Sequence, residues 1–211
     1  MNPLFSRLLE TKTDQEVIQF LEDLSKHANL KWRPVGDREN NLATINLGSD
    51  PAAGLVERIT NAIDAVLDRK WIEAGQPDYI KSPRQASEEW FGFENGKLVG
   101  VDLGNKKIRE DITKQVIVTL HDSGVDRRPT VDIRDKGIGI KSEDFGSTIL
   151  SLNEGRKLNK LFLAGAFGQG GSTALSYSNF TIIISRAINL SINSTKPNPV
   201  AFTIVRFNEG D

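Results

Sequence analysis

From Thr130 to Ile140 the chain reads TVDIRDKGIGI, a short β-branched run that ends in an aspartate and two closely spaced glycines. Side chains alternate along a strand, so Val131, Ile133 and Asp135 share one face. We expect this apolar face to be covered, which directs Asp135 inward at the end of the strand. A carboxylate in that position needs hydrogen-bond donors that replace water.

Two kinds of donor suit Asp135. One is an external ligand, such as the amino group of adenine. The other is the backbone of its own glycine turn, because aspartate commonly accepts hydrogen bonds from nearby N–H groups. Gly137 and Gly139 permit a close approach or a positive φ. Taken alone, the D-x-G-x-G pattern favours the turn.

A long helix is predicted upstream, from Pro51 to Ala74. Asp50 and Pro51 form a helix start, and Gly75 and Pro77 end the helix. At about 100° per residue, one side of this helix is apolar and should pack on a sheet. Its members are Leu55, Val56, Ile59, Ile63, Val66 and Leu67. A narrow polar stripe on the other side contains Glu57, Asn61, Asp64 and Asp68.

The stripe contains no lysine or arginine, although solvated helix faces usually mix charges of both signs. Glu57 and Asn61 are one turn apart and can address the same small volume. Asn61 would bind Mg²⁺ through its carbonyl oxygen, as hard cations prefer, and Glu57 would deprotonate a water. For this helix in isolation, a solvated face is the favoured interpretation.

A glycine-rich loop, Gly165–Gly171, precedes Ser172 and Thr173. Backbone N–H groups at a helix start form an anion site, but no G-K-[ST] follows, so this is not a Walker A loop. A flexible connection with a Ser/Thr cap has equal standing. Lys157 and Lys160 precede the loop and would reach phosphates, although a solvated basic stretch is favoured for either.

The remaining pattern predicts one domain over residues 1–211. It has an N-terminal helix and arm (1–50), the acidic helix (51–74), an irregular insertion (75–113) and a strand-rich part (114–211). The predicted helices cover about 14–28, 83–90, part of 141–160 and 172–178. The predicted strands are Gln115–His121, Thr130–Asp135, Phe180–Ser185 and Phe202–Phe207. Helices followed by antiparallel pairs favour an α/β (α+β) two-layer sandwich on a mixed, mostly antiparallel sheet.

Composition excludes several classes of function. The chain has 211 residues, a net charge of −1, no cysteine and two histidines, His27 and His121. Thiolate metal sites, disulfides and a histidine metal cluster are therefore excluded. The charge gives no indication of nucleic-acid binding. Without an apolar run of membrane-spanning length or a signal-peptide core, we expect a cytoplasmic protein and no membrane.

The three stretches in this order resemble the GHKL ATPases, the superfamily of gyrase, heat-shock chaperone, histidine kinase and MutL. Residues 57–65, ERITNAIDA, resemble the first motif of that superfamily, with a glutamate four residues before an asparagine. Residues 115–140 resemble the hairpin that leads into its adenine-binding aspartate, and residues 165–175 resemble the end of its ATP lid. The resemblance covers about Pro51 to Phe207, with the insertion at 75–113 outside it, and implies the Bergerat fold.

The resemblance also implies roles for individual residues. Glu57 would be the general base, Asn61 the Mg²⁺ ligand, and Asp135 the partner of the adenine amino group. Thr203 would contact adenine from the last strand. The implied nucleotide-binding set is Asn61, Asp64, Asp135, Gly137, Gly139, Ile140, Gly165, Phe167, Gly168, Gln169, Gly170, Gly171, Ser172, Thr173 and Thr203.

Two features depart from the superfamily pattern. Gyrase-like members often pair a basic residue between the two glycines with an acid on the first helix, and here Ile138 and Ala65 hold those places. This removes a gyrase assignment. Phe202–Phe207 also fits a hairpin strand that comes before the last core strand of the superfamily. The turn-like ending Asn208–Asp211 suggests that the chain continues in a longer protein.

The function implied is slow, Mg²⁺-dependent ATP hydrolysis that drives a conformational switch, with a homodimer forming on ATP binding or an attached or separate effector responding to it. A nucleotide sensor without catalysis is the alternative. A histidine-kinase-like phosphotransferase is the third, but that branch usually has asparagine in place of Glu57, and the sequence around His27 does not resemble a phosphoacceptor.

Overall fold

The structure is a computed structural model of the chain, and it describes residues 3–34, 50–145, 160–165, 175, 177–189 and 196–207. Helices and antiparallel strands are both present, so the α+β class is confirmed. The helices are α1 (Pro3–Glu10), α2 (Asp14–Ser25), α4 (Pro51–Glu73), α5 (Pro83–Phe91) and α6 (Lys106–Thr113), with short 3-10 turns at Glu94–Gly96 and Ser142–Asp144. The strands are β1 (Val116–His121), β2 (Thr130–Asp135), β3 (Phe180–Ser185) and β4 (Ala201–Arg206).

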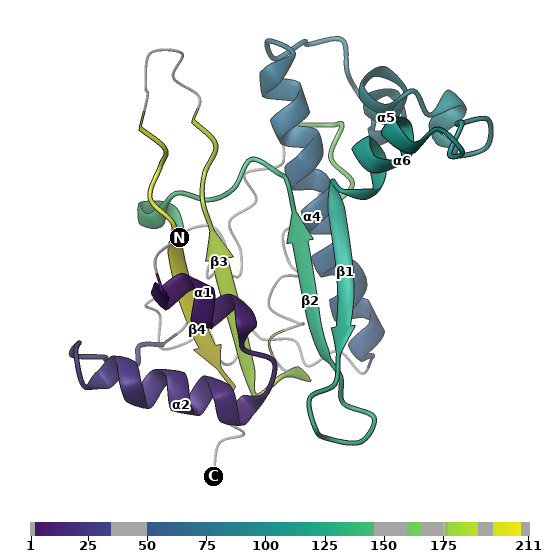
Figure 1. Ribbon diagram of the computed structural model, residues 1–211. Helices are drawn as coiled ribbons and strands as arrows, with labels where there is room; N and C mark the ends of the chain where they lie inside the picture. Colours follow the sequence, from purple (N-terminus) through teal and green to yellow (C-terminus); the bar gives the residue numbers. More distant parts are fainter. Residues whose placement is uncertain are drawn as a thin grey trace.

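The four strands form two hairpins, β1–β2 and β3–β4, each antiparallel. Figure 1 shows β2 and β3 side by side and running in the same direction. In the described residues the two hairpins remain separate two-stranded sheets, whereas the sequence predicts one mixed sheet. Beyond the strand ends they are joined by two hydrogen bonds: Ile188 N–H donates to the Ile138 carbonyl (2.8 Å) and Ile140 N–H donates to Ser185 Oγ (2.9 Å).

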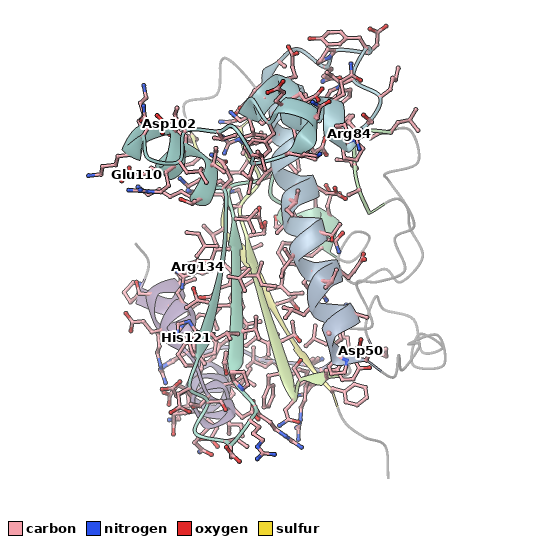
Figure 2. The ribbon with its side chains drawn as sticks, turned by 90° about the vertical axis from the view of Figure 1, so that its right-hand side faces the viewer. Asp50, Arg84, Asp102, Glu110, His121 and Arg134 are labelled. Atoms are coloured by element: carbon pink, nitrogen blue, oxygen red, sulfur yellow. The ribbon has the colours of Figure 1, made fainter. Side chains whose placement is uncertain are left out.

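Helices lie on both sides of the strands, as the turned view in Figure 2 shows. The ring of Phe202 on β4 packs edge-on against Phe5 of α1 (5.8 Å) and Phe20 of α2 (6.2 Å). Helix α4 lies on the other side and contacts β1 and β2. This arrangement differs from the predicted two layers, because α1 was not predicted and, with α2, covers the second face.

Helix α4 begins as the sequence predicts. Asp50 caps it by accepting a hydrogen bond from Ala52 N–H (2.8 Å), and Pro51 follows in the first turn. The prediction of its packing side is partly wrong, because Val56 and Ile63 are 61% and 44% exposed. Ala65 of α4 lies against Gly137, just after the end of β2, and these small residues let the helix approach closely. The packed side of α4 is therefore turned away from Val56 and Ile63.

The insertion at 75–113 is more regular than expected. Helix α5 begins at the Ser82 cap, close to the predicted helix, and α6 was not predicted because its eight residues are mostly charged. Leu67 of α4 shares a buried cluster with Ile80 and Ala86 of the insertion and with Phe162 and Leu163, and Trp71, Trp90 and Phe91 pack against it. The start of the insertion is therefore anchored to the second half of α4.

No helix in the described parts of the chain combines the length and the apolar character that crossing a bilayer requires.

Gly139 is a test of the junction between the hairpins. It has φ +68°, and an added Cβ would lie 2.6 Å from the Arg186 carbonyl carbon. Gly124 has φ +76° but nothing within 4 Å of an added Cβ. We expect Gly124→Ala to lower the free energy of unfolding by about 1–2 kcal/mol, because alanine is strained in the left-handed backbone conformation. Gly139→Ala should lower it clearly more, because the neighbouring backbone must also move. Urea unfolding of both variants measures the difference, and equal costs would contradict the close contact.

Candidate functional site

The acid–amide pair of α4 forms one end of the candidate site. Asn61 Nδ2 donates a hydrogen bond to Glu57 Oε1 at 3.3 Å, and the pair is partly buried. The amide nitrogen of Asn61 is directed to the carboxylate, so its oxygen is the atom that a hard cation would take. The two side chains therefore address one volume, as their spacing predicts.

One turn further along α4, the helix meets the D-x-G-x-G turn. Ile138 N–H donates to the carbonyl of Ala65 at 3.0 Å. A Cβ at Gly137 would lie 2.7 Å from the carbonyl carbon of Ala65 and also too close to its methyl group. Only glycine fits at this contact. The turn after Asp135 is therefore held against the helix directly beyond Asn61.

Asp135 accepts a hydrogen bond from Gly137 N–H through Oδ1 (2.8 Å), so the turn role is confirmed. The expectation of a covered carboxylate is wrong, because Asp135 is exposed, as is Val131 on the same face (40%). Partial desolvation still raises the pKa of the Asp135 carboxyl, and the Gly137 hydrogen bond opposes that rise. Among the described residues no donor to Oδ2 is seen, which leaves this oxygen for a ligand.

Asp64 is the buried acid of the stripe, at 2% exposed. Its Oδ1 accepts a hydrogen bond from Ala164 N–H (2.8 Å), and its Oδ2 accepts one from Gly165 N–H (2.9 Å). Both oxygens therefore hold the start of the predicted glycine-rich loop on α4. Direct nucleotide binding by Asp64 stays a prediction.

Asp68, the next acid of the stripe, is used in the same way. Lys160 Nζ lies 2.6 and 2.7 Å from its two carboxylate oxygens and 5.1 Å from the ring centre of Trp71. Lys160 is thus held by α4, so the favoured interpretation of a solvated lysine is wrong, whereas a phosphate contact by Lys160 stays a prediction. The acidic stripe is not a solvated face: two of its members secure the segment 160–165.

Two further residues to be placed, Ser185 and Thr203, lie on β3 and β4. Ser185 on β3 accepts the hydrogen bond from Ile140 N–H, so it fixes the end of the glycine turn. Thr203 is opposite Ile183 in the β3–β4 register, and therefore shares a face with Ser185. This places Thr203 on the face that holds Ile140 and away from the face that Phe202 presents to α1 and α2.

The remaining predicted residues of the glycine-rich loop lie outside the described residues. They are Phe167, Gly168, Gln169, Gly170, Gly171, Ser172 and Thr173, and Lys157 before them also lies outside. Of the loop, Gly165 is described and is placed on α4 by Asp64.

Two residues of the site were not predicted. Arg69 donates from Nη1 to the carbonyl of Lys136 at 2.6 Å, and Ser185 holds Ile140. Arg69 follows Glu57, Asn61 and Ala65 at the same four-residue spacing, so extending the stripe by one turn would have found it. Ser185 has no comparable sequence signal, because its role depends on how the hairpins are placed.

An ionic cluster lies on the face of β2 that points away from α4, where Figure 2 places Arg134 and His121. Asp132 is 2.6 Å from Arg134, 3.7 Å from Lys12 and 3.7 Å from His121. Desolvation alone would raise the pKa of Asp132, but the hydrogen bond and charge of Arg134, with smaller effects of Lys12 and His121, lower it overall. The cluster attaches the N-terminal arm and is separate from the site.

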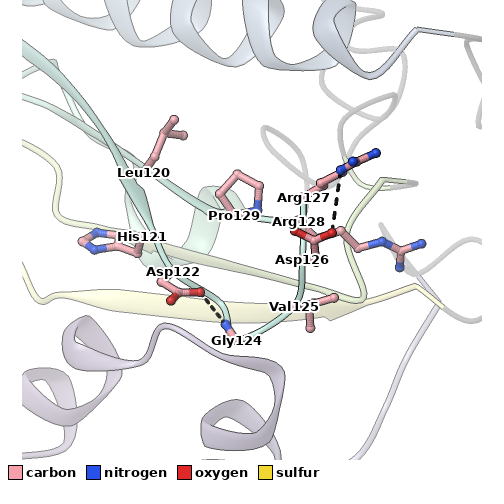
Figure 3. A pocket seen from close by; sticks show the side chains of 9 residues that line it. All are labelled: Leu120, His121, Asp122, Gly124, Val125, Asp126, Arg127, Arg128 and Pro129. Atoms are coloured by element: carbon pink, nitrogen blue, oxygen red, sulfur yellow. Dashed lines mark hydrogen bonds and ion pairs between the residues drawn. The ribbon is translucent and has the colours of Figure 1, made fainter.

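An open hollow of about 470 Å³ lies within the β1–β2 connection and is lined by residues from Leu120 to Pro129. Figure 3 shows it with two interactions drawn, Gly124 to Asp122 and Arg127 to Asp126. Its lining comes from the last two residues of β1 and from the connection that follows, at the end of β2 opposite to Asp135. It therefore plays no part in the candidate site.

Comparisons with protein-family models, with curated proteins and with solved structures gave no match for this chain. Among the described residues, no group of three or more histidine or acidic side chains could hold a metal ion by itself.

Asp135→Asn tests the electrostatics of this position. The raised pKa means that the folded state binds the proton more tightly than the unfolded chain, whose Asp pKa is about 4. The contribution of Asp135 to stability is therefore greatest below about pH 4 and falls as the pH rises through the folded-state pKa. Asparagine keeps the acceptor for Gly137 without the charge, so we expect the variant to be at least as stable as wild type at pH 7.

The control is Asp122→Asn, because Asp122 accepts from Gly124 N–H (2.9 Å) with the same D-x-G spacing. Urea unfolding at pH 4 and pH 7 gives both free energies of unfolding for each protein. A loss of stability at pH 7 that is larger for Asp135→Asn than for the control would contradict the assigned direction.

Proposed function

We propose that this chain is an ATP-binding domain of the GHKL type with the Bergerat fold, and that it hydrolyses ATP slowly with Mg²⁺. The observation that carries the proposal is the convergence on α4 of two stretches that are far from it in sequence. The turn after Asp135 and the loop start at Gly165 both contact α4 within three helical turns of the Glu57–Asn61 pair that the helix itself carries.

Each component suits one part of a purine triphosphate. Asp135 offers Oδ2 to the adenine amino group, while its Oδ1 is kept by Gly137. Gly137, Gly139 and Ile140 border the base, and Thr203 shares the sheet face that holds Ile140. The backbone N–H groups that follow Gly165 along the predicted loop would bind the phosphates.

The residues present fit Mg²⁺ in the way this ion is usually bound. Mg²⁺ takes one or two protein oxygens, keeps several waters and uses substrate phosphates for the rest. Asn61 would supply the protein oxygen, and when bound the ion neutralises phosphate charge. Glu57, held beside Asn61 at 3.3 Å, would take the proton of the attacking water as general base.

Slow hydrolysis of this kind serves a conformational switch. We infer that nucleotide binding changes the surface around the loop after Gly165, and that a second copy of the chain or an effector protein reads the change. A sensor that binds nucleotide without turnover is the second candidate. Phosphotransfer of the histidine-kinase kind is the least supported, because Glu57 stands where that branch has asparagine.

Replacing Glu57 separates hydrolysis from binding. We expect Glu57→Ala to lower the ATP turnover rate by about 10²–10⁴-fold, the usual contribution of a general base, while ATP binding stays within a few fold of wild type. Asn61→Ala should instead abolish the Mg²⁺ dependence of binding. Phosphate release and isothermal titration calorimetry with and without Mg²⁺ measure both effects.

The control is Glu88→Gln, an exposed acid of α5 outside the site, which should behave as wild type. If Glu57→Ala turns over ATP at the wild-type rate, Glu57 is not the base. Wild-type binding without any phosphate release would favour the sensor, and no binding at all would end the proposal.

A further inference from the structure

We propose that Asp64 and Arg69 are positioning residues through which α4 holds the two ends of the nucleotide site separately. Asp64 would set the phosphate end and Arg69 the base end. The inference rests on the proposed function and concerns positioning; the direct nucleotide contact that the resemblance implies for Asp64 is a separate prediction.

The argument for Arg69 starts from one peptide unit, the bond between Lys136 and Gly137. Arg69 Nη1 donates to the carbonyl of Lys136 at 2.6 Å, and the N–H of the same peptide donates to Asp135 Oδ1 at 2.8 Å. A charged donor on the carbonyl polarises the peptide and strengthens its N–H as a donor. Arg69 thus fixes both the orientation and the strength of the bond that sets the Asp135 carboxylate.

The Arg69 side chain is itself held in place by a neighbouring side chain of α4. Its side chain is 21% exposed, and Nε lies 2.9 Å from Glu73 Oε1, one turn further along α4. This ion pair restricts the guanidinium rotamers and leaves Nη1 directed at the turn. Ile138 N–H, bonded to the Ala65 carbonyl, secures the next part of the same turn. The base-side turn is thus attached to two successive turns of the helix.

Asp64 performs the corresponding task at the other end. A buried carboxylate is costly unless donors replace its water, and this one accepts from two successive N–H groups, Ala164 at 2.8 Å and Gly165 at 2.9 Å. Two N–H groups can satisfy both oxygens of a carboxylate, whereas an amide side chain would turn an NH₂ group toward one of them. The charge and shape of Asp64 therefore fix where the glycine-rich loop leaves the helix.

The two residues should therefore affect different parts of the ligand. Loss of the Arg69 bond loosens Asp135, which every adenine-containing ligand would use. Loss of the Asp64 bonds displaces the start of the phosphate loop, which adenosine would not use. A merely structural loss at Asp64 would weaken adenosine as well as ATP. For Arg69, whose variants should weaken all three ligands, the readouts that separate positioning from a structural role are rescue by lysine and amide exchange confined to its own turn.

The experiment measures the affinity of adenosine, ADP and ATP with Mg²⁺ for Arg69→Gln, Arg69→Lys and Asp64→Asn by titration calorimetry. A hydrogen bond to a charged group corresponds to about a ten-fold change or more. We expect Arg69→Gln to weaken all three ligands by about ten-fold, with part of the loss restored by lysine. Asp64→Asn should weaken ATP by a similar factor and leave adenosine unchanged. Arg84→Gln, an exposed site on α5, is the control.

Amide hydrogen exchange without ligand gives a second, independent measurement. Arg69→Gln should speed exchange at Gly137 and Ile138, and Asp64→Asn should speed it at Ala164 and Gly165, each without affecting the other pair. Asp64→Ser replaces Asp64→Asn if the latter fails to fold. If wild type binds none of the three ligands, the proposed function is wrong, and the exchange pattern alone then decides the positioning roles. Equal effects of both variants on both segments, or on all ligands, would overturn the inference.

Discussion

The close contact between Ala65 and Gly137 is the constraint on which the site depends. Helix α4 and the turn after Asp135 approach so closely that a Cβ at Gly137 would collide with the backbone of Ala65. At this separation Ile138 N–H reaches the Ala65 carbonyl, and Arg69 reaches the Lys136 carbonyl. A larger residue at either position would push the turn outward and break both bonds. The small side chains of Ala65 and Gly137 therefore allow the turn to attach to the helix without burying another charge.

The second constraint is electrostatic and concerns the acids of α4. Burial of Asp64 at 2% exposure would destabilise the fold unless its charge met donors. The two N–H groups of Ala164 and Gly165 meet that need, and Lys160 does the same for Asp68. Since charged hydrogen bonds are strong when shielded from water, the helix and the segment 160–165 are expected to move together. The backbone at Gly165 is thereby coupled to the helix that carries Glu57 and Asn61.

Local pattern was sufficient to predict most elements but few of their contacts. The Asp50 cap and the β1–β2 hairpin follow from signals close together in the sequence, and the structure has them. Helix α6 was missed because its charged sequence has little periodic apolar signal, and α1 because it is short. The packing side of α4 was misjudged at Val56 and Ile63, since hydrophobicity alone ignores where small residues allow close approach. Ser185 and the pairing of Lys160 with Asp68 depend on segments distant in sequence, which no local pattern reports.

Every motif in this chain also had an interpretation that needs no ligand. The structure supports that interpretation for several of the residues. Asp135 Oδ1 caps its turn, Asp64 holds a loop, and Lys160 pairs with Asp68. These roles account for the glycines and for two of the acids without any ligand. They do not account for Asp135 Oδ2, which has no donor among the described residues, while partial desolvation raises the pKa of this carboxyl. Perturbed carboxylates of this kind gather at functional sites, so the ligand hypothesis is stronger for Asp135 than for the glycines that first suggested it.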